Sequence, residues 1–404
     1  MYQIYRRFSC VLIACIVLIL GLLCFFQTTL PDTYYFSQSN DLQFPESYRP
    51  LLSFQNTRSS TSLVFSSETV PRKTEIDLFG LIPVKAAHIE PLNDKTVTVC
   101  GTPFGVKMFT DGVMIVSLSP IPTSEGMLCP AANAGIQEGD VIHSIDGQTV
   151  FTNEDVAATI QSSDGQSLSF SLERDGKPLS VTIIPEKASD GSGYKVGFWV
   201  RDSSAGIGTM TFCDPEIGIF AGLGHAICDT DTGNVLPLLN GDVVPAIISS
   251  VKKGKSGKPG ELVGNFFMAE TIGILKINNE TGVYGTLLAE PQGSSVPIAP
   301  KQTIREGEAT ILSTISGSEA KEYTIQIEKV SLAEKSPTKN MVIRVTDPEL
   351  LEQTGGIIQG MSGSPILQNG KLVGAVTHVF VNDPTKGYAI FAENMWQTAS
   401  SLFE

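Results

Sequence analysis

The stretch "GGIIQGMSGSPILQNGKLVGAVTHVFV", residues 355–381, contains the strongest local folding signal in the chain. The dipeptide Asn-Gly at 369–370 lies between two apolar runs, which is the pattern of a tight β-hairpin. Just before this hairpin, Gly360 and Gly363 flank Ser362, and glycine permits backbone conformations that other residues resist. The sequence therefore predicts a sharp serine turn that is supported by a rigid pair of strands.

The composition excludes several classes of function. The chain has 404 residues, which is enough for two or three domains that each bury a core. Charged residues make up 17%, the net charge is −14 and basic tracts that would bind nucleic acid are missing. Because no Cys-x-x-Cys pair occurs and the four histidines are isolated in the sequence, we expect no metal site and no cofactor.

The first thirty residues differ from the rest. Arg6 and Arg7 precede an apolar run from about Phe8 to Phe26, which is long enough to approach the thickness of a bilayer core. Arginines on the N-terminal side favour a cytoplasmic N-terminus, so the body is expected on the outer face of the membrane. A cleaved signal peptide gives a similar pattern, but no small-x-small site follows Phe26, which favours an uncleaved anchor over residues 1–30.

Residues 31–100 are interpreted as a tether and a segment before the first domain. Up to about residue 75 they are rich in Ser, Thr, Gln and Asn and lack a sustained periodicity. Such a segment is expected to be mobile and open to proteolysis.

The stretch "PAANAGIQEGDVIHSIDGQTV", residues 130–150, joins a turn of small residues, a Gly-Asp corner, a strand and an Asp-Gly turn. It resembles PDZ domains of the bacterial protease-associated type, and the resemblance covers residues 101–187. In such domains a glycine-containing loop binds a peptide carboxylate while the peptide adds a strand beside a helix. The resemblance implies that Phe104, Gly105 and Val106 form this loop. A PDZ fold that serves only as a rigid spacer is the alternative.

A second hairpin is predicted by "GTMTFCDPEIGIFAGLGHAI", residues 208–227, where two strands flank an Asp-Pro-Glu turn. The second strand ends at His225. Cys213 and Cys228 flank this hairpin, so their spacing permits a disulfide that braces His225, with free thiols as the alternative.

These two segments together contain the groups needed for nucleophilic catalysis. A serine hydroxyl becomes a good nucleophile when a histidine accepts its proton. Ser362 is the candidate nucleophile and His225 the candidate base, while the N–H groups of Gly360 and Ser362 are candidates for an oxyanion hole. Ser364 is the rival nucleophile, but Pro365 biases it toward the extended backbone of the following strand.

A Gly-x-Ser-Gly turn before a hairpin, with a histidine on an earlier hairpin, resembles the chymotrypsin-like double β-barrel serine peptidases. The order of membrane segment, PDZ domain, "GLGHAI" and the closing motif resembles more closely the stage IV sporulation protein B peptidase family. The resemblance implies a mostly β chain with a serine peptidase domain over residues 193–404. The family's catalytic triad then corresponds to His225, Asp347 and Ser362.

The third triad position is open at this stage. Asp347 lies unusually close in sequence to Ser362 for a chymotrypsin-like peptidase, and an Asp-Pro turn at the surface is an alternative interpretation. Asp229 and Asp231, which follow His225, are rival candidates.

His378 lies on the strand that follows the hairpin. In a chymotrypsin-like barrel this strand usually lines the pocket for the side chain preceding the cut bond, so we expect His378 to contact the substrate. A buried histidine that is bonded to backbone is the alternative.

The resemblance also implies a biological role. It is that of a serine endopeptidase of sporulation, anchored in the membrane, with its body in the space between the mother-cell and forespore membranes. Such an enzyme cleaves itself in the tether and then cuts a membrane-bound regulator of an intramembrane protease, so that a late mother-cell sigma factor is activated. The PDZ domain is expected to bind the chain's own N-terminal segment or this regulator.

Two other functions are kept as alternatives. The first is a non-catalytic PDZ adaptor built on a peptidase fold. The second is a general envelope quality-control protease, in which the PDZ domain normally follows the protease domain.

Overall fold

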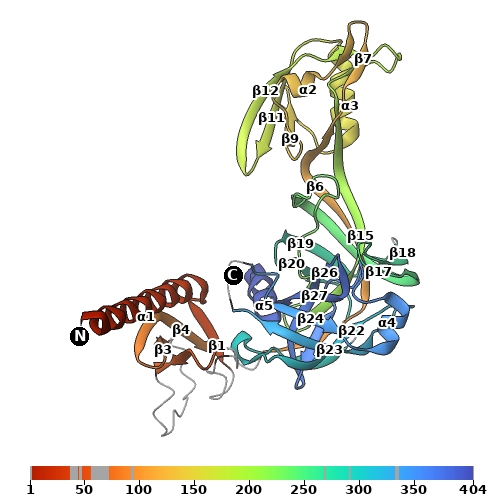
Figure 1. Cartoon of the computed structure of the whole chain (residues 1–404). Coiled ribbons are helices and arrows are strands. Elements are labelled where there is room, and N and C mark those ends of the chain that lie inside the picture. The colour runs from red at the N-terminus through yellow and green to blue at the C-terminus, as the bar shows by residue number, and fades with distance from the viewer. Residues whose placement is uncertain are drawn as a thin grey trace.

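The computed structural model describes residues 2–36, 44, 48–55, 72–91, 95–267, 270–290, 293–332 and 336–403. The chain is mostly β, with 51% strand and 17% helix, as predicted. Figure 1 shows an N-terminal unit, a body that contains a barrel, and a PDZ domain that is joined to the body by a narrow pair of strands.

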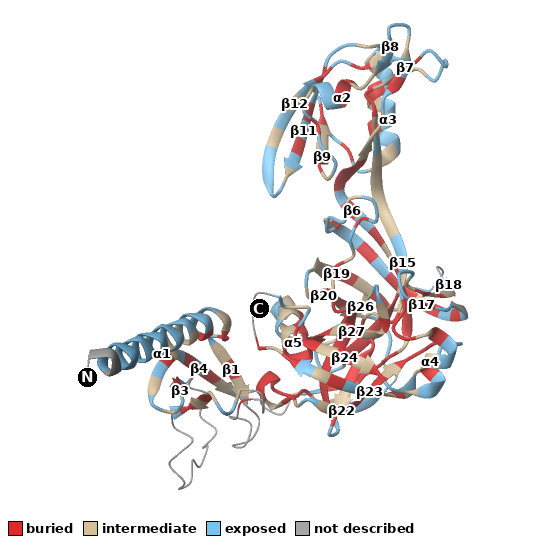
Figure 2. Cartoon of the chain, viewed as in Figure 1, coloured by how far each residue is buried: buried red, intermediate tan, exposed pale blue. Residues whose placement is uncertain are grey.

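The N-terminal unit combines an apolar helix with a small sheet. Helix α1 (Tyr2–Thr29) contains a candidate span, Tyr5–Thr29, that is long and apolar enough to cross a membrane, and an 18-residue window within it has a mean hydropathy of 3.0. Figure 2 shows that this helix is exposed along most of its length. The sheet has the order β1-β4-β3-β2 and is formed by β1 (Thr33–Phe36), β4 (Ile82–Pro91), β3 (Arg72–Leu78) and β2 (Leu52–Phe54).

The described parts of the predicted tether are therefore folded, and much of the remainder lies outside the described residues. The aromatic side chains within the polar sequence explain the difference. The rings of Tyr34 and Phe54 pack edge to face with centroids 5.1 Å apart, and both side chains are buried. Aromatic burial of this kind stabilises structure that a count of polar residues does not predict.

The C-terminal half of the body is a closed six-stranded barrel. Its strands, in order around the barrel, are β22 (Gly307–Ser313), β23 (Lys321–Val330), β24 (Met341–Val345), β27 (Asp383–Phe391), β26 (Lys371–Phe380) and β25 (Pro365–Gln368). The hairpin predicted at 369–370 is confirmed: Gln368 pairs with Lys371, and both turn residues have positive φ.

The N-terminal half of the body is formed by part of a large sheet. Its strands there are β5 (Thr96–Val99), part of β6 (Pro103–Leu118), part of β15 (Phe198–Asp214), β16 (Ile219–Gly222), β17 (Leu238–Lys252), β18 (Glu261–Phe266), β19 (Gly273–Asn279), β20 (Gly282–Leu287) and β21 (Ser294–Pro297). Within this sheet β6, β17, β19, β20, β16 and β15 pair in turn, and β15 pairs with β6 again, so the N-terminal half also closes into a barrel. The body is therefore a double barrel, and the ends of β6 and β15 extend from it into the PDZ domain.

The PDZ domain takes the remaining strands of the same sheet. These are the ends of β6 and β15 together with β9 (Val141–Ile145), β11 (Leu168–Arg174) and β12 (Lys177–Ile183), and the helices are α2 (Pro130–Asn133) and α3 (Asn153–Ser162). Helix α3 begins at a capping box in which Thr152 and Asp155 each bind the other's backbone N–H. Val113, Ile142 and Phe170 are among the residues of its separate core.

The PDZ domain is inserted into the body rather than placed before it. Strands β6 and β15 pair from Phe198↔Leu118 in the PDZ domain to Thr209↔Pro103 in the body. The first half of β6 therefore belongs to the body, although the sequence prediction assigned residues 101–187 to the PDZ domain. Apolar packing is the physical reason, since Phe104, Val106 and Met108 lie in one core with Phe220 and Val243.

A buried ion pair connects the body to its last helix, α5 (Ala392–Ser400). Lys301 lies in a short 3-10 helix (Lys301–Thr303), and its Nζ is 3.2 Å from Oε1 of Glu393. The backbone N–H of Lys301 also donates to Oε2 of Glu393 at 3.0 Å. Both side chains are buried, and burial raises the pKa of Glu393 while Lys301 lowers it in part.

We predict that Lys301→Met lowers the free energy of unfolding by about 3–5 kcal/mol, because Glu393 is then left buried without its partner. The matched control is Lys321→Met, whose exposed pair with Glu349 is expected to contribute about 1 kcal/mol or less. Urea unfolding followed by tryptophan fluorescence measures both variants. Equal losses in the two variants would contradict the prediction.

Candidate active site

The predicted serine turn forms between α4 (Pro348–Thr354) and β25. Gly360 and Gly363 have φ values of +95° and +94°, in the left-handed region that glycine occupies readily. A Cβ on Gly363 would lie 2.0 Å from the carbonyl oxygen of Thr209. The second glycine is therefore required by the close approach of β15.

Strand β15 holds the carbonyl groups of this turn. The N–H of Thr209 donates to the carbonyl of Ser362 at 3.0 Å, and its Oγ1 donates to the carbonyl of Gly360 at 2.8 Å. Thr211 Oγ1 donates to the carbonyl of Gly363 at 2.7 Å. Within the part of the chain that the structure describes, the N–H groups of Gly360 and Ser362 donate no hydrogen bond, so the prediction that they bind an oxyanion remains compatible with this turn.

Ser362 and His225 line one cavity of about 500 Å³ between the two halves of the body. His378 lines the same cavity from β26. The N-terminal half of the body contributes His225, just after β16, and the C-terminal half contributes the other two side chains. The fold thus brings together Ser362, His225 and His378, for which the sequence predicted the roles of nucleophile, base and substrate contact.

In this conformation the side chains of Ser362 and His225 each contact a backbone carbonyl oxygen. Ser362 Oγ donates to the carbonyl oxygen of Thr377 at 2.8 Å. His225 Nδ1 is 2.8 Å from the carbonyl oxygen of Ala226. Because a carbonyl only accepts, this contact assigns the proton to Nδ1 and leaves a lone pair on Nε2, which is the tautomer a general base needs.

The rings of His225 and His378 lie against each other, with centroids 4.9 Å apart and an angle of 36°. Burial lowers the pKa of His225, and its bond to the Ala226 carbonyl raises that pKa in part. Burial, followed by the charges of His225 and Lys339, lowers the pKa of His378 to about 4. Both rings are therefore neutral at pH 7, and His225 can accept a proton there.

Residues 192–396 match the family described as SpoIVB peptidase S55, and residues 128–174 match a PDZ domain family. The chain belongs to the SpoIVB peptidase S55 family. It is accordingly a serine endopeptidase that carries a PDZ domain.

The zinc protease relatives among curated proteins match this chain at the PDZ level. The regulator of sigma-E protease RseP of Escherichia coli is 40% identical over 68 residues, which are 17% of this chain and 15% of RseP. The regulator of sigma-W protease RasP of Bacillus subtilis is 29% identical over 91 residues, 21% of this chain and 22% of RasP. The chain thus spans less than a quarter of the length of either relative.

Two solved structures show partial similarity. The PDZ domain of an SdrC-like protein from Listeria monocytogenes is 22% identical, covers 22% of this chain and 87% of that chain, and has a TM-score of 0.19. The active form of the Rv3671c protease from M. tuberculosis is 14% identical, covers 49% of this chain and 74% of that chain, and has a TM-score of 0.29.

The predicted peptide-binding loop of the PDZ domain is wrong. Phe104, Gly105 and Val106 pair with β15 and β17 in the body, so they lie outside the PDZ fold. A groove of about 350 Å³ instead lies between α3 and residues 194–200. The missed signal is Val-Gly-Phe at 196–198, which repeats the same apolar-Gly-apolar pattern after the PDZ segment rather than before it.

The structure of the peptidase does not bring Asp347 to His225. Asp347 is the N-cap of α4: its Oδ1 accepts from the N–H of Leu350 at 3.0 Å, and its Oδ2 accepts from the N–H of Thr324 at 3.3 Å. Pro348 follows at the first helical position, which is a common start of a helix. In this conformation the Asp-Pro pattern therefore caps α4. The group beside His225 Nδ1 is the carbonyl of Ala226 instead of a carboxylate.

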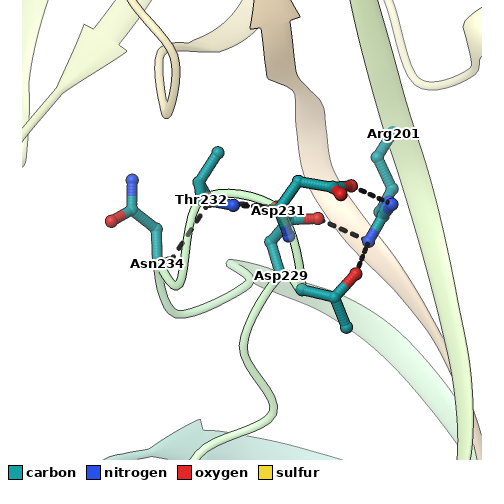
Figure 3. A network of polar contacts seen from close by, with 6 residues as sticks. Arg201, Asp229, Asp231, Thr232 and Asn234 are labelled. Atoms are coloured by element: carbon teal, nitrogen blue, oxygen red, sulfur yellow. Dashed lines mark hydrogen bonds and ion pairs between the residues drawn. The ribbon is translucent and has the colours of Figure 1, made fainter.

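The rival aspartates do not orient His225 either. Asp229 Oδ2 lies 2.5 Å from Nη1 of Arg201, and Asp231 Oδ2 lies 2.7 Å from Nη2 of the same side chain. Figure 3 shows the three side chains together, with the N–H of Thr232 directed at Asp229. Both carboxylates therefore stabilise the loop that follows His225.

Two further predictions concern nearby side chains. Ser364 is buried, and its Oγ donates to Oγ of Ser313 at 3.0 Å, which favours Ser362 as the nucleophile. Cys213 lies beside Cys100, with the sulfurs 3.5 Å apart, whereas Cys228 is exposed. The disulfide considered between Cys213 and Cys228 is not formed, because β15 pairs Cys213 with β5 instead.

We predict that activity falls at acidic pH with a midpoint below pH 6.5. The protonated form of His225 cannot accept the proton of Ser362, and burial places its pKa below the usual 6.5. The rate of labelling by a fluorophosphonate between pH 4 and 9 measures this midpoint. A midpoint above 6.5, or loss of the acid limb in His378→Gln, would contradict the assignment to His225.

For Asp347→Ala we expect a loss of about 0.5–2 kcal/mol in the free energy of unfolding, because the cap of α4 is removed. Asp347→Asn retains a capping oxygen and should keep most of the stability. Chemical unfolding and kcat are measured for both variants. If Asp347→Asn keeps its stability but loses kcat by orders of magnitude, Asp347 acts in catalysis rather than as a cap alone.

Proposed function

We propose that the chain is a membrane-tethered peptidase of sporulation. It cleaves itself in the segment that follows α1 and then cleaves a membrane-bound regulator of an intramembrane protease, which activates a late mother-cell sigma factor. The observation that carries the catalytic part is the shared cavity of Ser362 and His225, with two free N–H groups in the serine turn. Family membership supports the role in sporulation.

The geometry supports a stepwise acyl transfer. Ser362 Oγ leaves the Thr377 carbonyl and attacks the peptide carbonyl carbon, while Nε2 of His225 takes the hydroxyl proton. The N–H groups of Gly360 and Ser362 bind the oxyanion as the tetrahedral intermediate forms. His225 then donates that proton to the leaving amine, and it activates a water molecule that hydrolyses the acyl-enzyme.

His378 is assigned to the substrate. Its imidazole lines the cavity beside His225, and its pKa of about 4 keeps it neutral at pH 7. A neutral imidazole can hydrogen-bond a polar side chain without the cost of burying a charge. We assign it to the wall of the pocket for the residue that precedes the cut bond.

Helix α1 supports the proposed placement of the enzyme. Arg6 and Arg7 precede most of the apolar run and favour a cytoplasmic N-terminus and an outward-facing body. With the proposed role in sporulation, that body lies in the space between the mother-cell and forespore membranes. The PDZ groove binds a peptide, either the enzyme's own N-terminal segment or the regulator. Self-cleavage releases the body from its anchor.

The proposal is tested on the full chain in detergent with a fluorophosphonate probe and by following fragments cut after α1. Label and fragments are expected in the parent and in Ser364→Ala, and they should be lost in Ser362→Ala and His225→Ala. Circular dichroism shows that each variant is folded. If the folded parent takes no label and stays whole, the protein is an adaptor and the proposal fails.

A further inference from the structure

Strand β15 runs without interruption from the PDZ groove to the serine turn (Figure 1). Phe198, Trp199 and Val200 at its start line the groove. Thr209, further along the same strand, makes two of the hydrogen bonds that hold the turn of Ser362. One strand therefore belongs to both sites.

The groove end of β15 has a free edge. From residue 198 to 204 the strand pairs with β6 on one side, and in the described part of the chain no strand pairs with its other side. Helix α3 borders that open edge, and the two elements form the walls of the groove. An extended peptide that enters the groove therefore adds a strand directly to β15.

Arg201 connects this part of β15 to the catalytic cavity. It follows Val200 directly, and its guanidinium binds Asp229, Asp231 and the hydroxyl of Thr230 (Figure 3). The side chain of Asp229 is fully buried, and both Asp229 and Thr230 line the cavity that contains Ser362. These residues belong to the loop that follows His225.

Asp202, the residue after Arg201, connects β15 to α3, which forms the other wall of the groove. Asp202 Oδ2 accepts from the N–H of Asn153, the first residue of α3, at 2.9 Å. The ladder between β15 and β6 shifts register on either side of Val200 and Arg201. Such irregularities change the local twist of a strand, so the segment that contacts both walls of the groove is also the segment where β15 departs from regular pairing.

We propose that peptide binding in the PDZ groove is coupled to the catalytic centre through β15, and that Arg201 is the positioning residue that carries this coupling to the loop of His225. A peptide strand on the free edge changes the twist of β15 at residues 199–203. Arg201 moves with the strand and changes the position of Asp229 and of the loop behind His225. Thr209 passes the same change to the oxyanion hole.

The test replaces an unidentified peptide with a side chain that fills the groove. Ala157→Trp places an indole on the groove face of α3, and the matched control, Ala158→Trp, places it on an exposed position outside the groove. Both are made in the parent full chain and in Arg201→Ala. Hydrogen exchange is measured for fragments that cover residues 225–232 and 358–364, together with the rate of fluorophosphonate labelling.

Ala157→Trp should change exchange in both fragments by at least about threefold, and Ala158→Trp should not. In Arg201→Ala the change at residues 225–232 should disappear. Arg174→Ala is the control for loss of an arginine: Arg174 is 29% exposed, like Arg201, and binds buried Asp140, but it lies on β11. In that background the effect of Ala157→Trp should persist.

Equal effects of the two tryptophans, or no effect of either, overturn the coupling. An effect at residues 225–232 that persists in Arg201→Ala overturns the role of Arg201. Because hydrogen exchange does not require activity, these outcomes are separate from the catalytic proposal. If no folded variant is labelled by the fluorophosphonate, the catalytic proposal fails and the coupling proposal is unaffected.

Discussion

The hydrogen bonds from β15 to the serine turn are the contacts on which the rest of the site depends. A glycine-rich turn has almost no side chains of its own to pack, so its shape must be imposed by neighbours. Thr209 and Thr211 do this by binding the carbonyls of Gly360, Ser362 and Gly363. The same contacts join the N-terminal barrel to the C-terminal barrel. The position of β15 therefore also determines the geometry of the turn that contains Ser362.

In the active site of this conformation, the hydrogen-bond partner that orients His225 is a weak one. A carboxylate beside Nδ1 stabilises the imidazolium that forms when serine is deprotonated, and a backbone carbonyl does so less because it carries only a partial charge. In this peptidase the partner of His225 is the carbonyl of Ala226, while nearby Asp229 is neutralised by Arg201. The serine also keeps its own bond to Thr377. These contacts describe a centre whose serine and histidine lie in one cavity but are poorly activated.

The sequence predicted the features that depend on short segments. The turn at 369–370, the glycines around Ser362 and the small-residue turn at 130–150 each have a local physical cause, and each forms. The insertion of the PDZ domain was not predicted in this way, because its local mark is ambiguous. Strand β6 leaves the body at Thr-Asp-Gly, residues 110–112, a pattern that also fits an ordinary turn within one domain. The two apolar-Gly-apolar patterns, at 104–106 and 196–198, look alike in sequence, and only their pairing partners separate them. The role of Asp347 could not be decided from the sequence either, since an aspartate before a proline fits both a triad position and a helix cap.

The insertion of the PDZ domain also constrains how the chain is made. Strands β5 and β6 leave the ribosome, and in our proposal cross the membrane, long before β16, β17 and β21 exist to pair with them. Contacts between residues so far apart form slowly, and the unpaired apolar strands are exposed to aggregation meanwhile. The PDZ domain has its own core and can fold first, which brings β15 beside β6 and prepares the rest of the sheet. A domain with its own core in the middle of a peptidase can thus fold before the peptidase around it, whereas the active site cannot form until the serine turn at residues 360–363 has been synthesised.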